Sequence, residues 1–212
     1  MKTNPSLNRS LTTLLCAATA SLLILSQPAQ AGYVVTLQQV GSNVVATGNG
    51  PIDLTDLSLI NINLPLAGGL EPSLPLIVTG PEVSGGTDHY AAVFSISGPT
   101  SFGSGVFSAP NSGSGDLVGI FNPTSFSGLV IVPHDYVSGT LSDSSTYLNA
   151  TFSSLGVTPG TYVWTWGTGA NQNFTLQIPT AGVPDSGSTL GLFLLSLIGL
   201  FGLNRLRQSQ LA

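Results

Sequence analysis

Between Gly32 and Gly182 the chain alternates short runs of β-branched and aromatic residues with clusters of Gly, Pro, Ser and Asn. Such runs favour strands, and the clusters between them favour turns. No window in this stretch carries an apolar stripe of helical period bounded by helix caps. Many short strands at intervals of roughly 10 to 15 residues indicate an all-β fold, a single jelly-roll-like β-sandwich. The predicted strands are 33–40, 44–47, 52–59, 90–96, 106–107, 117–121, 129–132, 150–152, 161–166 and 174–178, with 98–115 mostly a long loop.

Every charge in this stretch is negative. The four basic residues of the chain lie outside it, at Lys2, Arg9, Arg205 and Arg207, whereas residues 32–182 contain eight acids and have a net charge near −8. Without Lys or Arg, this region lacks the phosphate-neutralising groups of nucleic-acid binding and phosphoryl transfer, and it cannot form a Schiff-base lysine. The acids are Asp53, Asp56, Glu71, Glu82, Asp88, Asp116, Asp135 and Asp143.

The length of this acidic stretch is that of one domain, large enough to bury a core. Its low charge and plentiful aliphatic residues predict a single folded ectodomain over 32–182. The surface must then consist largely of Ser, Thr, Asn, Gln and Gly, as in extracellular proteins that live among polysaccharide. Extracellular polysaccharide is therefore a candidate partner.

Residues 1–31 have the pattern of a secretory signal peptide. Lys2 and Arg9 provide a basic start, 11–25 is apolar, and Ala29 and Ala31 form a small-x-small cleavage site. Cys16, the only cysteine, lies inside the apolar stretch and follows Leu15 where a lipoprotein signal would need a small residue. We predict an exported chain whose mature part has no cysteine and forms no disulfide.

The C-terminal end has the pattern of a membrane segment. Residues 187–203 contain no charge and are just long enough to cross a hydrocarbon core of about 30 Å. Arg205 and Arg207 follow as a basic stop, which stays on the cytoplasmic side. We predict a short transmembrane helix at about 187–203 with the ectodomain outside. A plain C-terminal anchor would explain this pattern, as would an ordinary core helix.

A short motif directly before this segment favours a more specific interpretation. The residues are Val183, Pro184, Asp185, Ser186 and Gly187, and Pro followed by Asp, Ser and Gly predicts an exposed, non-helical turn. Motif, apolar segment and basic stop over 183–208 resemble the VPDSG form of the PEP-CTERM sorting tail of exported bacterial proteins. The resemblance implies that an exosortase recognises the tail, cleaves near the motif and transfers the ectodomain to another carrier. It also implies a chain held only transiently at the inner membrane, then placed at the outer surface or secreted.

Catalytic and metal-binding patterns are weak in the ectodomain. Its two histidines occur in Asp88-His89-Tyr90 and His134-Asp135-Tyr136. A zinc or catalytic site needs converging ligands, and because neighbours on a strand point to opposite faces, each His would need partners from elsewhere in the fold. We therefore favour surface or loop-edge polar residues over a site that joins both pairs. Neither Gly-x-Ser-x-Gly nor a glycine-rich phosphate loop is present. Asp53 and Asp56 could contribute oxygen ligands to calcium but lack a calcium-loop spacing. We predict no catalytic residue, no metal site and no cofactor.

Three aromatic residues make 161–167 the most distinctive ectodomain segment. Tyr162, Trp164 and Trp166 fall on one face of the predicted strand. They could supply the bulk of a core that otherwise lacks large residues, which we favour, or an exposed platform on which sugar rings stack.

The leading hypothesis is a non-enzymatic, exported cell-envelope or extracellular-matrix protein. Its predicted partners are the export machinery, the exosortase and, until processing, the membrane. The first alternative is a secreted carbohydrate-binding module that uses the aromatic strand face. The second is a secreted glycosidase, which would need two suitably spaced acids in a cleft.

Overall fold

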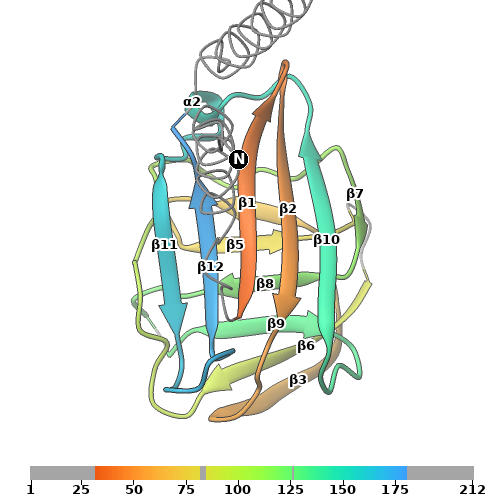
Figure 1. Ribbon diagram of the computed structural model, residues 1–212, viewed down its shortest axis with the longest axis vertical. Coiled ribbons are helices and arrows are strands. Elements are labelled where there is room, and N and C mark those ends of the chain that lie inside the picture. Colours follow the sequence, from red (N-terminus) through yellow and green to blue (C-terminus); the bar gives the residue numbers. More distant parts are fainter. Residues whose placement is uncertain (1–31, 82–84, 126, 181–212) are drawn as a thin grey trace, which may run out of the picture.

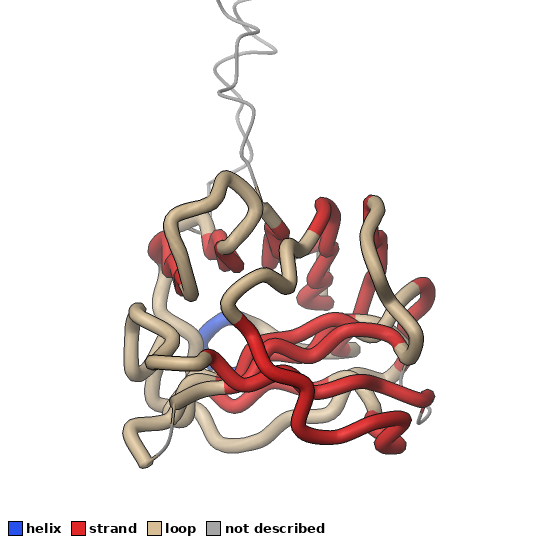
Figure 2. Tube along the Cα trace, turned by 90° about the horizontal axis from the view of Figure 1, so that it is seen from below, coloured by secondary structure: helices blue, strands red, loops and turns tan. Residues whose placement is uncertain are grey.

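The strands of the acidic stretch form two six-stranded sheets that pack face to face (Figure 1). The computed structural model describes residues 32–81, 85–125 and 127–180. Sheet A has the strand order β11-β12-β1-β2-β10-β7, and sheet B has the order β3-β6-β9-β8-β5-β4. The strands of sheet B run across those of sheet A in Figure 1, and Figure 2 shows the two layers from below. The fold is therefore a β-sandwich with crosswise packing.

The bounds of the elements follow the chain from β1 to β12. Sheet A contains β1 (Tyr33–Val40), β2 (Asn43–Pro51), β7 (Ser112–Gly115), β10 (Thr140–Tyr147), β11 (Gly160–Thr165) and β12 (Asn173–Ile178). Sheet B contains β3 (Leu57–Leu66), β4 (Gly69–Glu71), β5 (Leu76–Thr79), β6 (Gly85–Ala92), β8 (Val118–Phe121) and β9 (Leu129–Pro133). The short helix α2 (Phe152–Leu155) connects β10 to β11.

The core lies between the sheets and follows the two-residue period of the strands. In β1, for example, Tyr33, Val35 and Leu37 are fully buried, whereas Val34 and Thr36 are only partly buried and belong to the outer face. Aromatic rings fill the end of the core near β11, where Trp164 lies edge-on to Phe102 and Phe174. This alternation fixes which side chains sheet A presents to solvent.

The sandwich confirms the predicted all-β class, with differences at several elements. The predicted strand at 150–152 is wrong, because Thr151 instead caps α2. Residues 106–107 form no strand, and the bridge in that region joins Leu70 to Ser108. The predicted strand at 52–59 begins later, as β3, and the predicted loop at 98–115 contains β7. β1 pairs in parallel with β12, which the sequence pattern did not predict.

Candidate functional site

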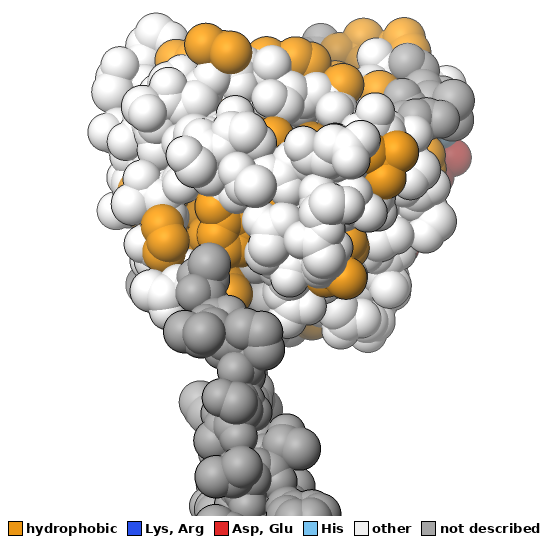
Figure 3. Space-filling model, turned by 90° about the horizontal axis from the view of Figure 1, so that it is seen from above, with side chains coloured by type: hydrophobic (Ala, Val, Ile, Leu, Met, Phe, Trp, Pro, Cys, Tyr) orange, Lys and Arg blue, Asp and Glu red, His pale blue; other side chains and the backbone are white. Residues whose placement is uncertain are grey.

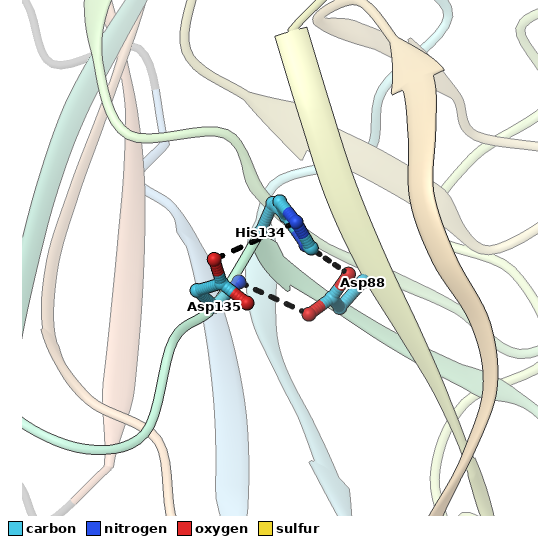
Figure 4. Close-up of side chains that lie close together, drawn as sticks. All are labelled: Asp88, His134 and Asp135. Atoms are coloured by element: carbon cyan, nitrogen blue, oxygen red, sulfur yellow. Dashed lines mark hydrogen bonds and ion pairs between the residues drawn. The ribbon is translucent and has the colours of Figure 1, made fainter.

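A cluster of three titratable side chains lies at one end of sheet B. Asp88 comes from β6, and His134 and Asp135 follow directly after β9 (Figure 4). β6 and β9 are antiparallel neighbours, with Asp88 opposite Val132, so the residues after β9 turn back over Asp88. In the described part of the chain this is the group of three His, Cys, Asp or Glu residues close enough to share a metal ion, with one donor atom from each within 4.8 Å of the others.

Asp88 is the centre of this cluster. Its side chain is only 6% exposed. Oδ1 accepts hydrogen bonds from the Asn63 amide at 2.9 Å and from His134 Nδ1 at 2.9 Å, and Oδ2 accepts one from the Asp135 amide at 3.1 Å. Asp135 has a φ of 62°, and this left-handed conformation is one that Asp tolerates better than most residues. The carboxylate thus ties β3, β6 and the turn after β9 together.

The hydrogen bonds of the cluster set its electrostatics. Burial alone would raise the pKa of Asp88, but the three N–H donors, from Asn63, His134 and Asp135, outweigh it and hold that pKa below its ordinary value. The hydrogen bond to Asp88 raises the pKa of His134 despite partial desolvation, and the charges of Asp135 and Asp88 add to the effect. His134 Nε2 lies 3.5 Å from Asp135 Oδ2. The ring therefore has one nitrogen fixed by Asp88 and the other beside a second carboxylate.

The interpretation of the His-Asp pairs as surface or loop-edge residues is wrong for Asp88 and His89, which are buried in β6, whereas His134 and Asp135 do lie at a loop edge directly after β9. Asp88 is buried and bonded to the other pair, 46 residues away. His89 is also buried and points the opposite way, with its Nε2 3.0 Å from Thr87 Oγ1. Burial lowers the pKa of His89, although the charge of Asp88 opposes this. The expectation that neighbouring residues of a strand point to opposite faces agrees with Asp88 and His89, which have different partners, but the sequence carried no signal for the long-range Asp88–His134 pair.

The aromatic strand face belongs to the core. Trp164 is fully buried and Trp166 is 5% exposed, and their indole N–H groups donate to the backbone oxygens of Pro99 and Asp53 at 2.8 Å each. Tyr162 is partly buried, stacks beside Trp164 and donates to the Thr158 carbonyl. The favoured core interpretation agrees with this burial, and the stacking platform that required exposed indoles at Trp164 and Trp166 is wrong.

Asp53 and Asp56 lie near the start of β3, and both carboxylates accept hydrogen bonds from the chain itself. Asp53 Oδ1 accepts from the Thr55 amide at 2.9 Å, and Asp56 Oδ2 accepts from Gln172 Nε2 at 3.1 Å. Asp53 thus stabilises its own turn, whereas Asp56 links the start of β3 to the segment before β12. The two acids are not part of the three-residue cluster around Asp88.

The outer face of sheet A carries an uncharged polar row that crosses all six strands. Each member lies directly beside the next through strand pairing, and each is exposed or partly exposed. Across the sheet, the row consists of Thr161, Gln177, Thr36, Thr47, Ser144 and Ser114. The sequence pattern indicated polar strand faces but not that these six side chains share one line, because register joins segments far apart in the chain.

Two shallow grooves adjoin this row. One has a volume of about 430 Å³ and the other about 570 Å³, and both are lined by Thr36 and Gln177. No charged residue lines either groove. In the face shown in Figure 3, neutral polar side chains and backbone likewise predominate among the described residues, with small scattered hydrophobic patches. The row and grooves can offer hydroxyl and amide donors and acceptors but no ion pair.

The predicted targeting residues fall outside the described parts of the chain. These are the signal-cleavage residues Ala29 and Ala31, the motif Val183–Gly187, the predicted membrane helix at about 187–203, and the basic stop at Arg205 and Arg207. In the described residues no helix is long and apolar enough to span a membrane. The last described strand, β12, ends at Ile178, close before the motif.

Comparison with known proteins identifies the C-terminal tail. No curated protein and no solved structure is significantly similar to the chain. The family model described as the VPDSG-CTERM motif matches residues 182–207, which include the predicted motif and both arginines. This motif implies an exported cell-surface protein that is processed by an exosortase. The chain therefore carries a VPDSG-CTERM motif, an exosortase-type sorting signal, at its C-terminal end.

Proposed function

We propose that the protein is a non-catalytic structural component of the cell surface or extracellular matrix, delivered as a folded β-sandwich and released from its tail by an exosortase. The observation that carries this proposal is the sorting motif at 182–207, which begins four residues after β12 ends at Ile178. A signal peptide over 1–31 starts export, and a membrane helix at about 187–203 holds the chain until cleavage. The cut separates the ectodomain from Arg205 and Arg207.

Intact mass spectrometry after cell fractionation tests this route. The full chain is expressed in a host with its exosortase and in the same host lacking that enzyme. We expect a surface or medium product that begins at Gly32 and lacks both arginines in the first host, and a membrane-bound product that retains the tail in the second. Asp185→Ala should reduce processing, whereas Thr180→Ala, just upstream of the motif, should not. A full-length cytosolic product carrying Met1 and Ala212 would contradict the proposal.

For the partner, we propose neutral extracellular polysaccharide bound along the outer face of sheet A. Support comes from the polar row, whose hydroxyls and amides both donate and accept hydrogen bonds as sugar hydroxyls do. Support also comes from charge, because residues 32–182 contain eight acids and no Lys or Arg, which disfavours an anionic polymer. Thr36 and Gln177, shared by both grooves, lie at the centre of the proposed contact.

Affinity electrophoresis through gels containing polysaccharide tests this partner. The mature protein should be retarded by a neutral polymer such as dextran and not by an anionic polymer such as alginate. Thr36→Val with Thr47→Val keeps the side-chain shape but removes two hydroxyls, so it should reduce the retardation. Thr124→Val, an exposed site between β8 and β9, is the control. If the double variant and the Thr124→Val control were retarded to the same extent, this face would be excluded as the binding surface. The sorting proposal would not be affected.

A further inference from the structure

We propose that His134 Nε2 and Asp135 Oδ2 form an exposed binding site for a divalent transition-metal ion of the Zn²⁺ class, with Asp88 holding the imidazole in position from the other side. The site lies on sheet B at the turn after β9 (Figure 4). It shares no residue with the sorting motif or with the polar row on sheet A.

The first support is the orientation of the imidazole. His134 Nδ1 lies 2.9 Å from Asp88 Oδ1, and Asp88 is itself fixed by the amides of Asn63 and Asp135. A carboxylate cannot donate when ionised, so the hydrogen of this bond resides on Nδ1. In the neutral ring the lone pair is then on Nε2, the atom that faces Asp135. This is the arrangement by which carboxylates orient metal-binding histidines from outside the ligand shell.

The second support is the spacing of the two donor atoms. His134 Nε2 and Asp135 Oδ2 are 3.5 Å apart. Two ligands bound to Zn²⁺ at its usual nitrogen and oxygen distances, with a tetrahedral angle between them, lie about 3.4 Å apart. The described conformation therefore brings both atoms to a chelating distance without rearrangement of the backbone.

The choice of ion follows from the donors. Imidazole suits Zn²⁺, Cu²⁺ and Ni²⁺, whereas Ca²⁺ and Mg²⁺ prefer shells made of oxygen. Asp88 belongs to the same cluster, but three N–H donors engage its carboxylate, so we assign it an orienting role rather than a third ligand. A negatively charged domain without Lys or Arg also draws cations toward its surface.

The two ligand side chains of the site are accessible to solvent and to other molecules. The side chain of His134 is 32% exposed and that of Asp135 is 86% exposed. Two protein ligands leave the remaining coordination positions of the ion open to water or to donor groups from outside the protein. We therefore assign this site to metal-mediated attachment at the surface.

Titration of the full-length chain with Zn²⁺ tests the proposal. The protein is purified in detergent with a tag that contains no histidine, and binding is followed calorimetrically and by competition with a chromophoric chelator. We expect one ion per chain and, with Co²⁺ as a probe, an absorption spectrum perturbed by nitrogen ligation. His134→Gln and Asp135→Asn should each weaken Zn²⁺ binding by at least about tenfold, and Asp88→Asn should weaken it by about 10- to 100-fold through loss of orientation.

Control variants separate a site from general attraction of cations. Asp53→Asn removes the same charge elsewhere and should leave Zn²⁺ affinity unchanged, and a large excess of Ca²⁺ should not displace Zn²⁺. Asn also tolerates the left-handed backbone of Asp135, so Asp135→Asn keeps the fold and remains informative even if His134→Gln does not fold. Unchanged affinity in Asp135→Asn, or equal weakening in Asp53→Asn, would overturn the proposal.

Discussion

Asp143 is a buried carboxylate on β10 of sheet A, between β2 and the edge strand β7. It accepts a hydrogen bond from the Tyr33 hydroxyl, and the glycine opposite it on β2, Gly48, leaves room for the pair, because a β-carbon there would collide with both side chains. Burial raises the pKa of Asp143 to about 6, although the hydrogen bond from Tyr33 opposes the shift. Burial and the charge of Asp143 also raise the pKa of Tyr33. The folded state therefore favours the neutral form of Asp143.

Asp143→Asn tests this consequence. The pKa of Asp143 is higher in the folded state than in the unfolded state, so the protonated carboxyl stabilises the fold. This stabilisation is fully present below about pH 4 and is lost as the pH rises toward and through about 6. The free energy of unfolding of the wild type, relative to that of the variant, should fall by on the order of 3 kcal/mol between pH 4 and pH 7. Urea denaturation across this range measures the difference.

Asp53→Asn provides a control of opposite sign. Hydrogen bonds from the Thr55 side chain and amide lower the pKa of Asp53, so its contribution to stability is present above its ordinary pKa and lost as pH falls. For Asp143 itself, the free energies of unfolding of wild type and Asp143→Asn are compared. If their difference stayed constant from pH 4 to pH 7, this would contradict the raised pKa of Asp143.

The two histidines should titrate on opposite sides of their ordinary pKa. NMR of the imidazole groups should give His134 a pKa above 6.5, because of its hydrogen bond to Asp88, and His89 one below 6.5, because of its burial. Stability from His134 is then present below pH 6.5 and is lost as pH rises through its raised pKa. Asp88→Asn should lower the pKa of His134 by more than that of His89, since only His134 bonds to Asp88. If the pKa values of both histidines shifted by the same amount, the effect would come from the net charge of the protein and not from the Asp88–His134 hydrogen bond.

At the scale of single elements, α2 is the clearest departure from the sequence prediction. Thr151 Oγ1 accepts from the Ser154 amide at 3.0 Å, and Ser154 Oγ accepts from the Thr151 amide at 2.8 Å, which forms a capping box. The turn buries Phe152 and Leu155 and ends at Gly156 with a φ of 64°. The β-prone residues at 150–152 thus start a helix because the cap and these two buried anchors outweigh strand propensity.

Thr151→Ala should reduce the free energy of unfolding by about 1 kcal/mol, because the Ser154 amide loses its acceptor. Chemical denaturation measures the change. Ser153→Ala, exposed in the same turn, should have a much smaller effect. Similar losses in both variants would mean that the cap does not stabilise α2.

How far the sequence predicts a strand depends on which side chains the strand buries. β1 buries Tyr33, Val35 and Leu37, so its apolar alternation predicts its bounds correctly. β10 was missed because its buried positions include Asp143 and Ser145, which interrupt the apolar pattern that identifies a half-buried strand. The Asp88–His134 pair and the polar row were missed for another reason. Both depend on the register between strands that are far apart in the sequence, and a local residue pattern does not reveal that register.

At the scale of the whole molecule, the distribution of charge distinguishes this protein. In the described residues the ion pairs involve only His134, with Asp88 and Asp135 as partners. Cohesion therefore comes mainly from the apolar core and the backbone hydrogen bonds of two sheets. Net negative charge disfavours close association of copies of the domain in solution.

The same distribution provides a direct assay of tail processing. Trypsin cleaves after Lys and Arg, which occur only at Lys2, Arg9, Arg205 and Arg207. A processed chain that begins at Gly32 and has lost both arginines should survive complete denaturation followed by trypsin with its mass unchanged. The unprocessed chain should shrink at its C-terminus to end at Arg205, because the two arginines remain accessible once the protein is denatured. Intact mass spectrometry before and after digestion separates the two forms. Loss of mass from the surface-exposed product would show that the tail is retained and would contradict cleavage upstream of Arg205.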